Sequence, residues 1–188
     1  MADLKLTLAC GPYDRTEALE RGSVRADGID LDVVTIQSPR TLFDRFIDDG
    51  DFDVAEYGIS TLIGDVARGN LSFVGLPVFP SKAFRHGFIF VNRRAGIETP
   101  GDLAGKTIGT PLWAQTAAIW IRGYLQHDYG VDLGSVRWVQ GAVEKAGSHG
   151  NPPLPDPLTP IDIVKAPPDK SLNDMLAEGS IDALIGSR

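Results

Sequence analysis

Short strand patterns alternate with short helix patterns along the N-terminal part of the chain. Leu4, Leu6 and Leu8 alternate with polar residues until Gly11, and the later segments keep the same order of strand and helix. The strand patterns lie at 4–10, 29–34, 52–55 and 71–79. The helix patterns lie at 17–21, at 39–50, where Ser38 and Pro39 indicate the start, and at 60–69, where Ser60 is the predicted cap. Because strands that alternate with helices are joined by crossover connections, this order predicts an α/β fold with mostly parallel sheets flanked by helices.

The remainder of the chain continues this pattern with one interruption. Strand patterns occur at 88–91, 106–109 and 181–185, the clearest helix lies at 116–129, and the capping box at Ser171 begins another helix. Residues 141–168 are dense in glycine and proline, which predicts a loop excursion. Trp120 and Tyr124 lie on the apolar stripe of the helix at 116–129 and are expected in the core. Arg122 lies off that stripe, and either a surface position or a role at a ligand site is open to it.

Two distant segments resemble each other. Residues 46–53 align with residues 175–182, and both indicate a helix end, a glycine cap and the start of a strand. We interpret them as equivalent parts of two similar α/β lobes, 1–87 and 88–188. Chance is the alternative, because glycine caps and short strands are common.

The residues after each repeated segment are candidates for a ligand site. Glu56 to Ser60 and Gly186 to Arg188 would lie at carboxyl ends of parallel strands, where open α/β sheets bind ligands. Glu56, Ser60 and Arg188 are therefore predicted site residues.

Composition narrows the classes of partner. The 188 residues are 43% hydrophobic, so the chain can bury a core, and the net charge of −7 argues against nucleic acid. No apolar run approaches the roughly 20 residues that span a bilayer. The N-terminus lacks the basic and apolar segments of a signal peptide. We therefore expect a cytoplasmic protein with no membrane partner, and self-association into a homo-oligomer stays open.

Several catalytic motifs are absent from the sequence. There is no GxGxxG, GxxxxGKS/T or GxSxG pattern, and the single cysteine, Cys10, excludes a CxxC motif. The three histidines are far apart, with no HxH or HExxH spacing. We therefore assign no metal ligands and expect no cofactor, while a divalent metal bound by residues that folding brings together stays open.

The segment 77–87 concentrates functional side chains between two strand patterns. Ser81, Arg85 and His86 supply a hydroxyl, a fixed cation and an imidazole that titrates near neutral pH. A planar ligand with several acidic groups would need this mixture, because arginine can bind a carboxylate through two parallel hydrogen bonds. A solvated loop is the alternative.

The segment 110–116 joins a strand pattern to the helix at 116–129. Thr110, Trp113, Gln115 and Thr116 lie where the N–H groups at the start of the helix attract an anion. Alternatively, Thr116 only caps the helix and Trp113 only packs.

Three runs of residues together resemble the 4,5-dihydroxyphthalate decarboxylase family. They are 76–86, which includes Phe84-Arg85-His86, the turn at 102–109, and 116–131, which begins Thr-Ala-Ala-Ile-Trp-Ile-Arg-Gly. The resemblance extends through most of the chain. It implies a two-lobe type II periplasmic-binding-protein-like fold with the ligand between the lobes, and a carboxy-lyase of phthalate degradation and aromatic catabolism that converts 4,5-dihydroxyphthalate to protocatechuate and CO2. Some similar proteins are solute-binding proteins, so a non-catalytic protein for a small organic anion is the alternative.

Members of that family are generally longer and continue after the strand at 181–185 back into the first lobe. We therefore expect either a C-terminally truncated fragment or an unusually small first lobe. If the chain is a truncated fragment, we expect an apolar face of that lobe to lie exposed or to be covered by a partner chain. Whether such a form is active stays open.

The chemistry of this reaction leads to hypotheses about roles. A ring hydroxyl para to the departing carboxylate can push electrons so that the ipso carbon is protonated and CO2 leaves. We expect His86 to donate the proton, Arg85 to bind the second carboxylate with the start of the helix at 116–129, and Glu56 or Ser81 to polarise the hydroxyls. The substrate-binding residues that we predict are Ser60, Ser81, Thr110, Trp113, Gln115, Thr116 and Arg188.

Overall fold

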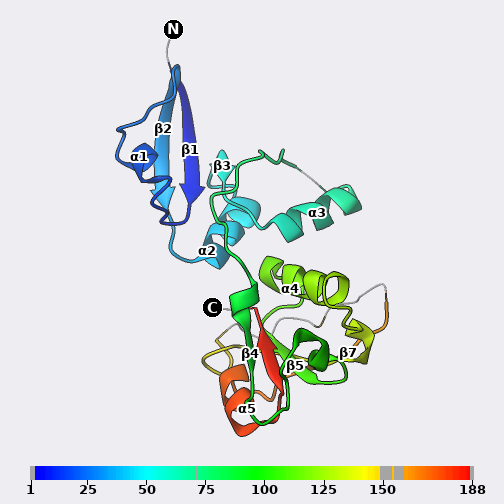
Figure 1. The fold of residues 1–188 in the computed structure, drawn as a ribbon. Coiled ribbons are helices and arrows are strands. Elements are labelled where there is room, and N and C mark those ends of the chain that lie inside the picture. The colour runs from blue at the N-terminus through cyan, green and yellow to red at the C-terminus, as the bar shows by residue number, and fades with distance from the viewer. Residues whose placement is uncertain (1–2, 71, 149–153, 155–158, 187–188) are drawn as a thin grey trace. The chain divides into compact units, whose positions relative to one another are not determined.

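The computed structural model describes residues 3–70, 72–148, 154 and 159–186, and it has two compact units, Met1–Ala83 and Phe84–Arg188 (Figure 1). Each unit has its own sheet, and the predicted α/β class is confirmed. The boundary lies at Ala83–Phe84, whereas we expected the lobes to divide after residue 87. Arg85 and His86 therefore belong to unit 2.

Unit 1 is built on a three-stranded parallel sheet in the order β2-β1-β3. Its elements are β1 (Leu4–Cys10), α1 (Glu17–Glu20), β2 (Ile29–Thr35), α2 (Pro39–Asp44), the π-helical turn η1 (Arg45–Asp49), β3 (Val54–Ala55) and α3 (Ile59–Arg68). Ala9, Leu42 and Phe52 form its buried core. Because β1 and β3 are parallel, their carboxyl ends meet at one edge of the sheet.

Local sequence accounts for the start of α2 but not for the start of α3. The Ser38 hydroxyl accepts a hydrogen bond from the Thr41 N–H at 3.3 Å at the start of α2, as expected for an N-cap serine. Gly58 rather than Ser60 is the N-cap of α3, so the predicted cap is wrong. Ser60 instead lies in the first turn of the helix.

Two segments of unit 1 lack the packing seen elsewhere in it. The extended run predicted at 71–79 is not a strand over its described part, 72–79. On α3, Ile63 is 62% exposed and Val66 is 56% exposed. Both side chains are therefore accessible on the surface of α3.

Unit 2 contains a five-stranded sheet in the order β4-β8-β5-β6-β7. Its elements are η2 (His86–Phe88), β4 (Ile89–Val91), η3 (Pro100–Leu103), β5 (Thr107–Thr110), α4 (Thr116–His127), η4 (Leu133–Ser135), β6 (Arg137–Gln140), β7 (Asp162–Lys165), α5 (Leu172–Glu178) and β8 (Ala183–Ile185). β4 is antiparallel to β8, and the other pairs are parallel. β7 lies inside the predicted loop excursion at 141–168, so that prediction is wrong for these residues.

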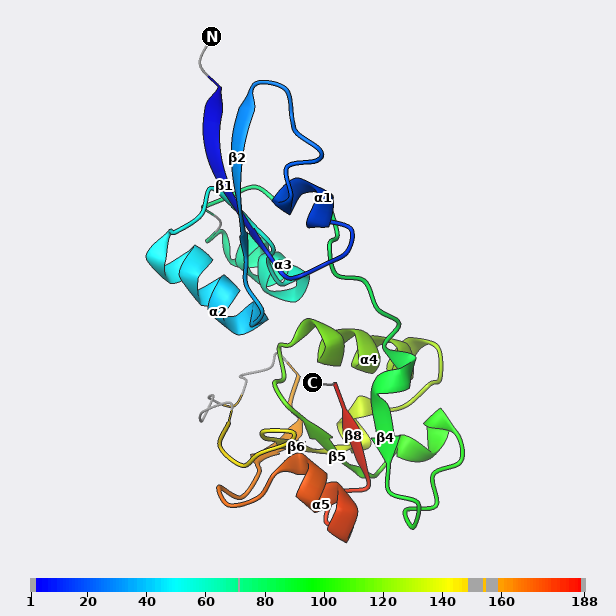
Figure 2. The ribbon, with the colours of Figure 1, turned by 90° about the vertical axis from the view of Figure 1, so that its left-hand side faces the viewer.

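The two helices α4 and α5 cover opposite faces of this sheet (Figure 2). Ile108 and Trp138 face α4 and pack with Ile121, whereas Val139 and Leu184 belong to the second cluster with α5. This division follows from the alternation of side chains along each strand. No helix within the described ranges is both long and apolar enough to cross a membrane.

The buried face of α4 differs from the predicted one. Its buried residues are Ala117, Ala118, Ile121, Arg122 and Leu125. Trp120, which we expected in the core, is 59% exposed. Because neighbouring positions in a helix are about 100° apart, a stripe centred on Ile121 and Leu125 takes in Ala118 and Arg122 and leaves Trp120 at its margin.

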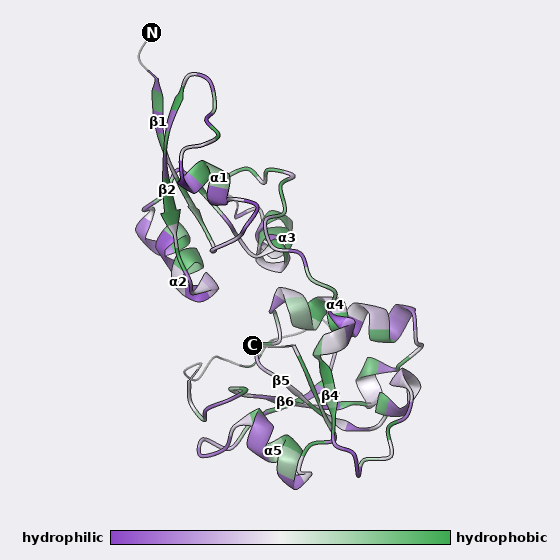
Figure 3. Ribbon diagram, turned by 60° about the vertical axis from the view of Figure 1, so that its left-hand side comes forward, coloured by the Kyte–Doolittle hydropathy of each residue, from purple (hydrophilic) through white to green (hydrophobic). Residues whose placement is uncertain are grey.

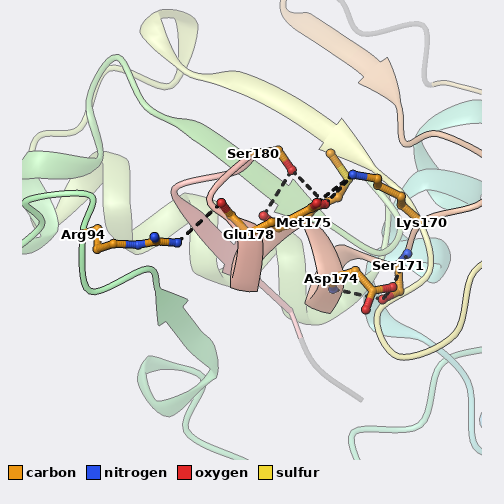
Figure 4. Close-up of polar contacts among 7 residues, drawn as sticks. All are labelled: Arg94, Lys170, Ser171, Asp174, Met175, Glu178 and Ser180. Atoms are coloured by element: carbon orange, nitrogen blue, oxygen red, sulfur yellow. Dashed lines mark hydrogen bonds and ion pairs between the residues drawn. The ribbon is translucent and has the colours of Figure 1, made fainter.

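The helix α5 is fixed at both ends by side chains (Figure 4). Ser171 and Asp174 form the predicted capping box, and Lys170 forms an ion pair with Glu178 at 2.6 Å. Arg94 donates to the carbonyl of Ala177 in the last turn. The ribbon of α5 carries both purple and green residues, as expected for a helix with one polar and one apolar face (Figure 3).

Candidate active site

Glu56 is held at the carboxyl end of β3 by two hydrogen-bond donors. Its Oε2 accepts from the Gly11 N–H at 3.1 Å, and its Oε1 accepts from the Tyr13 hydroxyl at 2.8 Å. The Glu56 N–H donates to the carbonyl of Ala9 at 2.9 Å and continues the pairing of β1 with β3. The carboxylate is therefore fixed at the edge of the sheet where the parallel strands end.

Tyr13 connects Glu56 to the segment 77–87. The side chain of Ser81 lies beside the Tyr13 hydroxyl and acts to lower its pKa, and the Arg15 guanidinium carbon lies 4.9 Å from the centroid of the Tyr13 ring. Burial and the hydrogen bond to Glu56 raise the pKa of Tyr13, so its hydroxyl stays protonated at neutral pH. Glu56 and Ser81, which we predicted as alternatives, thus contact the same tyrosine.

The turn after β1 sets the place of the Tyr13 ring. A Cβ added at Gly11 would lie 2.9 Å from atoms of that ring, closer than side-chain carbons normally approach. A larger residue at position 11 would therefore displace Tyr13 and its hydrogen bond to Glu56.

The connection between β5 and α4 carries buried polar atoms without partners. Thr110 ends β5 and is fully buried, and neither its hydroxyl nor Gln115 Oε1 has a hydrogen-bond partner within the described residues. Gln115 is the N-cap of α4 and makes no side-chain capping bond, and Thr116 is the first residue of the helix. Thr116 is therefore not the cap. Unpaired buried polar atoms are rare in folded proteins, so this connection differs from an ordinary loop.

In the connection between β5 and α4, side chains form hydrogen bonds with both the backbone N–H and the carbonyl of Trp113. Its N–H donates to Gln140 Oε1 at 2.9 Å, and its carbonyl accepts from Arg122 Nη2 at 2.7 Å. Its ring stands edge-on to Trp138, with centroids 5.3 Å apart. The backbone between β5 and α4 is thus fixed relative to the sheet.

His86 stacks on an aromatic residue of α4. The rings of His86 and Tyr124 are nearly parallel, with centroids 4.1 Å apart, and Tyr129 stands edge-on to both. These three rings and apolar side chains from β4 and η3 line a pocket of about 280 Å³. Burial raises the pKa of Tyr124 to about 12, so its hydroxyl, which has no hydrogen-bond partner within the described residues, stays protonated.

The other predicted site residues take separate places. The Arg85 guanidinium carbon lies 5.1 Å from the centroid of the Phe88 ring, and its association with the start of α4 stays a prediction. Arg188 lies outside the described residues. Within the described part of the chain, no three His, Cys, Asp or Glu side chains are grouped so as to hold a metal ion.

Two residues of these clusters, Tyr13 and Gln140, were not predicted from the sequence. Tyr13 follows the carboxyl end of β1, and the rule that selected Glu56 at a strand end could have found it. Gln140 ends β6, a strand that the sequence patterns did not predict. Its amide supports Trp113 across the sheet edge.

Two curated proteins are similar to the whole chain, although no protein-family model matches it. The 4,5-dihydroxyphthalate decarboxylase of Pseudomonas putida is 38% identical over 188 residues, which are 100% of this chain and 72% of that protein. The 4,5-dihydroxyphthalate decarboxylase of Comamonas testosteroni is 37% identical, over 100% of this chain and 56% of that protein. The chain therefore spans about half the length of the Comamonas protein.

A solved structure from Bordetella bronchiseptica RB50 is a weaker match. It aligns with 97% of this chain and 50% of its own, with 15% identity and a TM-score of 0.40. A similarity of this size does not decide between detailed folds.

Proposed function

The chain belongs to the 4,5-dihydroxyphthalate decarboxylase family, and from this membership we propose that it takes part in the decarboxylation of 4,5-dihydroxyphthalate or a close relative. The observation that supports the proposal is 38% identity over 188 residues to a decarboxylase of which the chain covers 72%. The activity would be that of a carboxy-lyase, and the substrate would be a small aromatic dicarboxylate.

The reaction replaces one carboxylate by hydrogen. A ring hydroxyl para to the departing group donates electron density to the ring, and the ipso carbon accepts a proton. The bond to the carboxylate then breaks, its electron pair returns to the ring, and CO2 leaves. The reaction therefore needs a proton donor, a hydrogen-bond acceptor for the phenol and a cationic or N–H site for the second carboxylate.

In unit 1, the proposed acceptor of the phenol proton is Glu56. Its carboxylate is already positioned by Gly11 and Tyr13, so it needs no rearrangement to accept a hydrogen bond from the substrate. Ser81, which lies beside the same tyrosine, is the proposed alternative contact to a hydroxyl.

In unit 2, the proposed proton donor is His86. Stacking on Tyr124 fixes the plane of the imidazole, and the adjoining pocket of about 280 Å³ gives a small molecule access to it. Arg85 and the segment 110–116 are the proposed contacts to the second carboxylate. Ser60 and Arg188 remain proposed substrate contacts.

The finer fold assignment belongs to the same proposal. A two-lobe type II periplasmic-binding-protein-like fold is supported by the two α/β units and by the repeated helix, glycine and strand in each. A role in phthalate degradation and a cytoplasmic location are further parts of the proposal.

The direct test is incubation of the full chain with 4,5-dihydroxyphthalate, with CO2 and protocatechuate followed together. Stoichiometric release of both supports the proposal, and parallel reactions with a chelator and with added Mg²⁺ or Mn²⁺ report any metal requirement. Binding of the dianion without CO2 under all these conditions would contradict it and support a solute-binding protein for small organic anions.

A further inference from the structure

Arg122 is a buried cation beside the connection between β5 and α4, and it has no acidic partner within the described part of the chain. It is only 7% exposed, and it donates a hydrogen bond to a neutral group, the carbonyl of Trp113. Its Nη1 is buried without a hydrogen-bond partner, and no carboxylate among the described residues forms an ion pair with it. Buried arginines are normally paired, because removal of the charge from water is costly.

Aromatic rings take the place of a counter-ion at Arg122. The guanidinium carbon lies 3.6 Å from the centroid of Trp113 and 5.9 Å from that of Trp138. Cation–π contacts of this kind stabilise a desolvated guanidinium without neutralising its charge. Burial lowers the pKa of Arg122 to about 10, so the side chain remains positive at neutral pH.

The charge lies next to the part of unit 2 where a ligand is expected. Arg122 from α4 holds the carbonyl of Trp113, and Gln140 at the carboxyl end of β6 holds its N–H, so both elements connect to this peptide. The first turn of α4 follows directly and adds the partial positive charge of a helix N-terminus. Thr110 contributes a fully buried hydroxyl to the same connection, and this hydroxyl has no hydrogen-bond partner among the residues that the structure describes.

We propose that Arg122 is the residue of unit 2 that selects an anionic ligand: it holds the Trp113 peptide in place and supplies an unneutralised positive charge to the carboxyl ends of β5 and β6. Because the guanidinium is covered by Trp113, it is a positioning residue that acts through Trp113 and through its electric field. The identity of the ligand as an aromatic dicarboxylate rests on the proposed function.

Two substitutions separate the charge of Arg122 from its hydrogen bond. Arg122→Gln keeps an N–H donor for the Trp113 carbonyl and removes the charge, and Arg122→Lys keeps the charge but loses the planar stack. Arg137→Gln, which removes an exposed arginine from the start of β6, is the matched control for net charge. Circular dichroism and thermal melting identify any variant that does not fold.

The measurement is calorimetric binding of 4,5-dihydroxyphthalate and of its neutral dimethyl ester to the full chain. For Arg122→Gln we expect the affinity for the dianion to fall about tenfold or more while the affinity for the ester is unchanged. Arg122→Lys should keep most of the preference for the dianion, and Arg137→Gln should keep all of it. Equal losses for both ligands, or no loss for the dianion, would overturn the proposal. If Arg122→Gln does not fold, loss of the dianion preference in folded Arg122→Lys overturns it instead.

Parallel measurement of CO2 release separates this inference from the proposed function. A wild-type chain that binds the dianion without release of CO2 contradicts the decarboxylase proposal, and the charge dependence of binding still tests Arg122. A chain that releases CO2 but whose Arg122→Gln variant binds the dianion like the wild type contradicts the inference alone.

Discussion

Asp182 makes in unit 2 the contact that Asp53 makes in unit 1. Asp53 Oδ2 accepts from the N–H of Thr7 at 2.8 Å, and Asp182 Oδ2 accepts from the N–H of Thr107 at 2.8 Å. Each aspartate thereby joins the start of one strand to the neighbouring parallel strand, one residue before their ladder begins. The similarity of residues 46–53 and 175–182 therefore has a shared structural cause, because an N–H at that place needs an acceptor.

Substitution of Asp53 should change how stability depends on pH. The hydrogen bonds from Thr7 lower the pKa of Asp53 below its ordinary value, so its contribution is fully present above about pH 4 and is lost as pH falls through the lowered pKa. Asp53→Asn should therefore lower the free energy of unfolding at pH 7, as measured by urea unfolding. It should also reduce the decrease of that free energy between pH 4 and pH 2. Asp30→Asn, on an exposed position of β2, is the control. Parallel curves for Asp53→Asn and the wild type would contradict this prediction.

Removal of the Tyr13 hydroxyl should weaken catalysis more than stability. Tyr13→Phe deprives Glu56 of one of its two donors while the Gly11 N–H remains, so the carboxylate is less well positioned. We expect kcat for CO2 release to fall about tenfold, as is typical for loss of one bond in a catalytic hydrogen-bond network. Ser23→Ala, which removes a hydroxyl of unit 1 that donates to the Ala18 carbonyl, is the control and should keep full activity. Equal kcat for Tyr13→Phe and the control would refute a role for Tyr13 in positioning Glu56.

Replacement of His86 should separate binding from chemistry. His86→Ala removes the proposed proton donor and should lower kcat by about 100-fold or more, the ordinary contribution of a general acid. Binding of 4,5-dihydroxyphthalate, measured by calorimetry, should persist. His127→Ala, at the last position of α4, controls for loss of an imidazole from the same unit. A His86→Ala variant with full CO2 release would exclude His86 as the donor.

Replacement of Arg85 should act on substrate affinity. Arg85→Leu removes a cation proposed to bind the second carboxylate and should raise KM about tenfold with a smaller change in kcat. Arg93→Leu removes an exposed arginine of the same unit and should leave KM unchanged. The proposed contact is wrong if Arg85→Leu has the KM of the wild type.

Local patterns in the sequence predict those elements whose signals lie close together in the chain. Ser38 with Pro39 and the capping box at Ser171 need only neighbouring residues, and both are found where predicted. In β6, buried and exposed residues do not alternate, because Trp138, Val139 and Gln140 are all buried. The two-residue period that identifies a half-exposed strand is therefore missing from its sequence. β7 was missed for another reason, because the glycine and proline residues around it predict a loop.

The candidate site depends on contacts that no local pattern contains. Tyr13 and Glu56 meet across 43 residues, because β1 and β3 end at the same edge of the sheet. Arg122 has the chemistry of a surface residue, and only the two tryptophans around it allow its burial. Glu56 and Ser81 were chosen from separate signals in the sequence, and Tyr13, which both contact, was not predicted.

The most direct measurement is the reaction of the full chain with 4,5-dihydroxyphthalate in D2O, with the product examined by proton NMR and mass spectrometry. Decarboxylation by protonation of the ring predicts one equivalent of CO2 and protocatechuate with a single deuterium at the carbon that lost its carboxylate. Recovery of unchanged 4,5-dihydroxyphthalate from a chain that binds it would contradict the proposed decarboxylation.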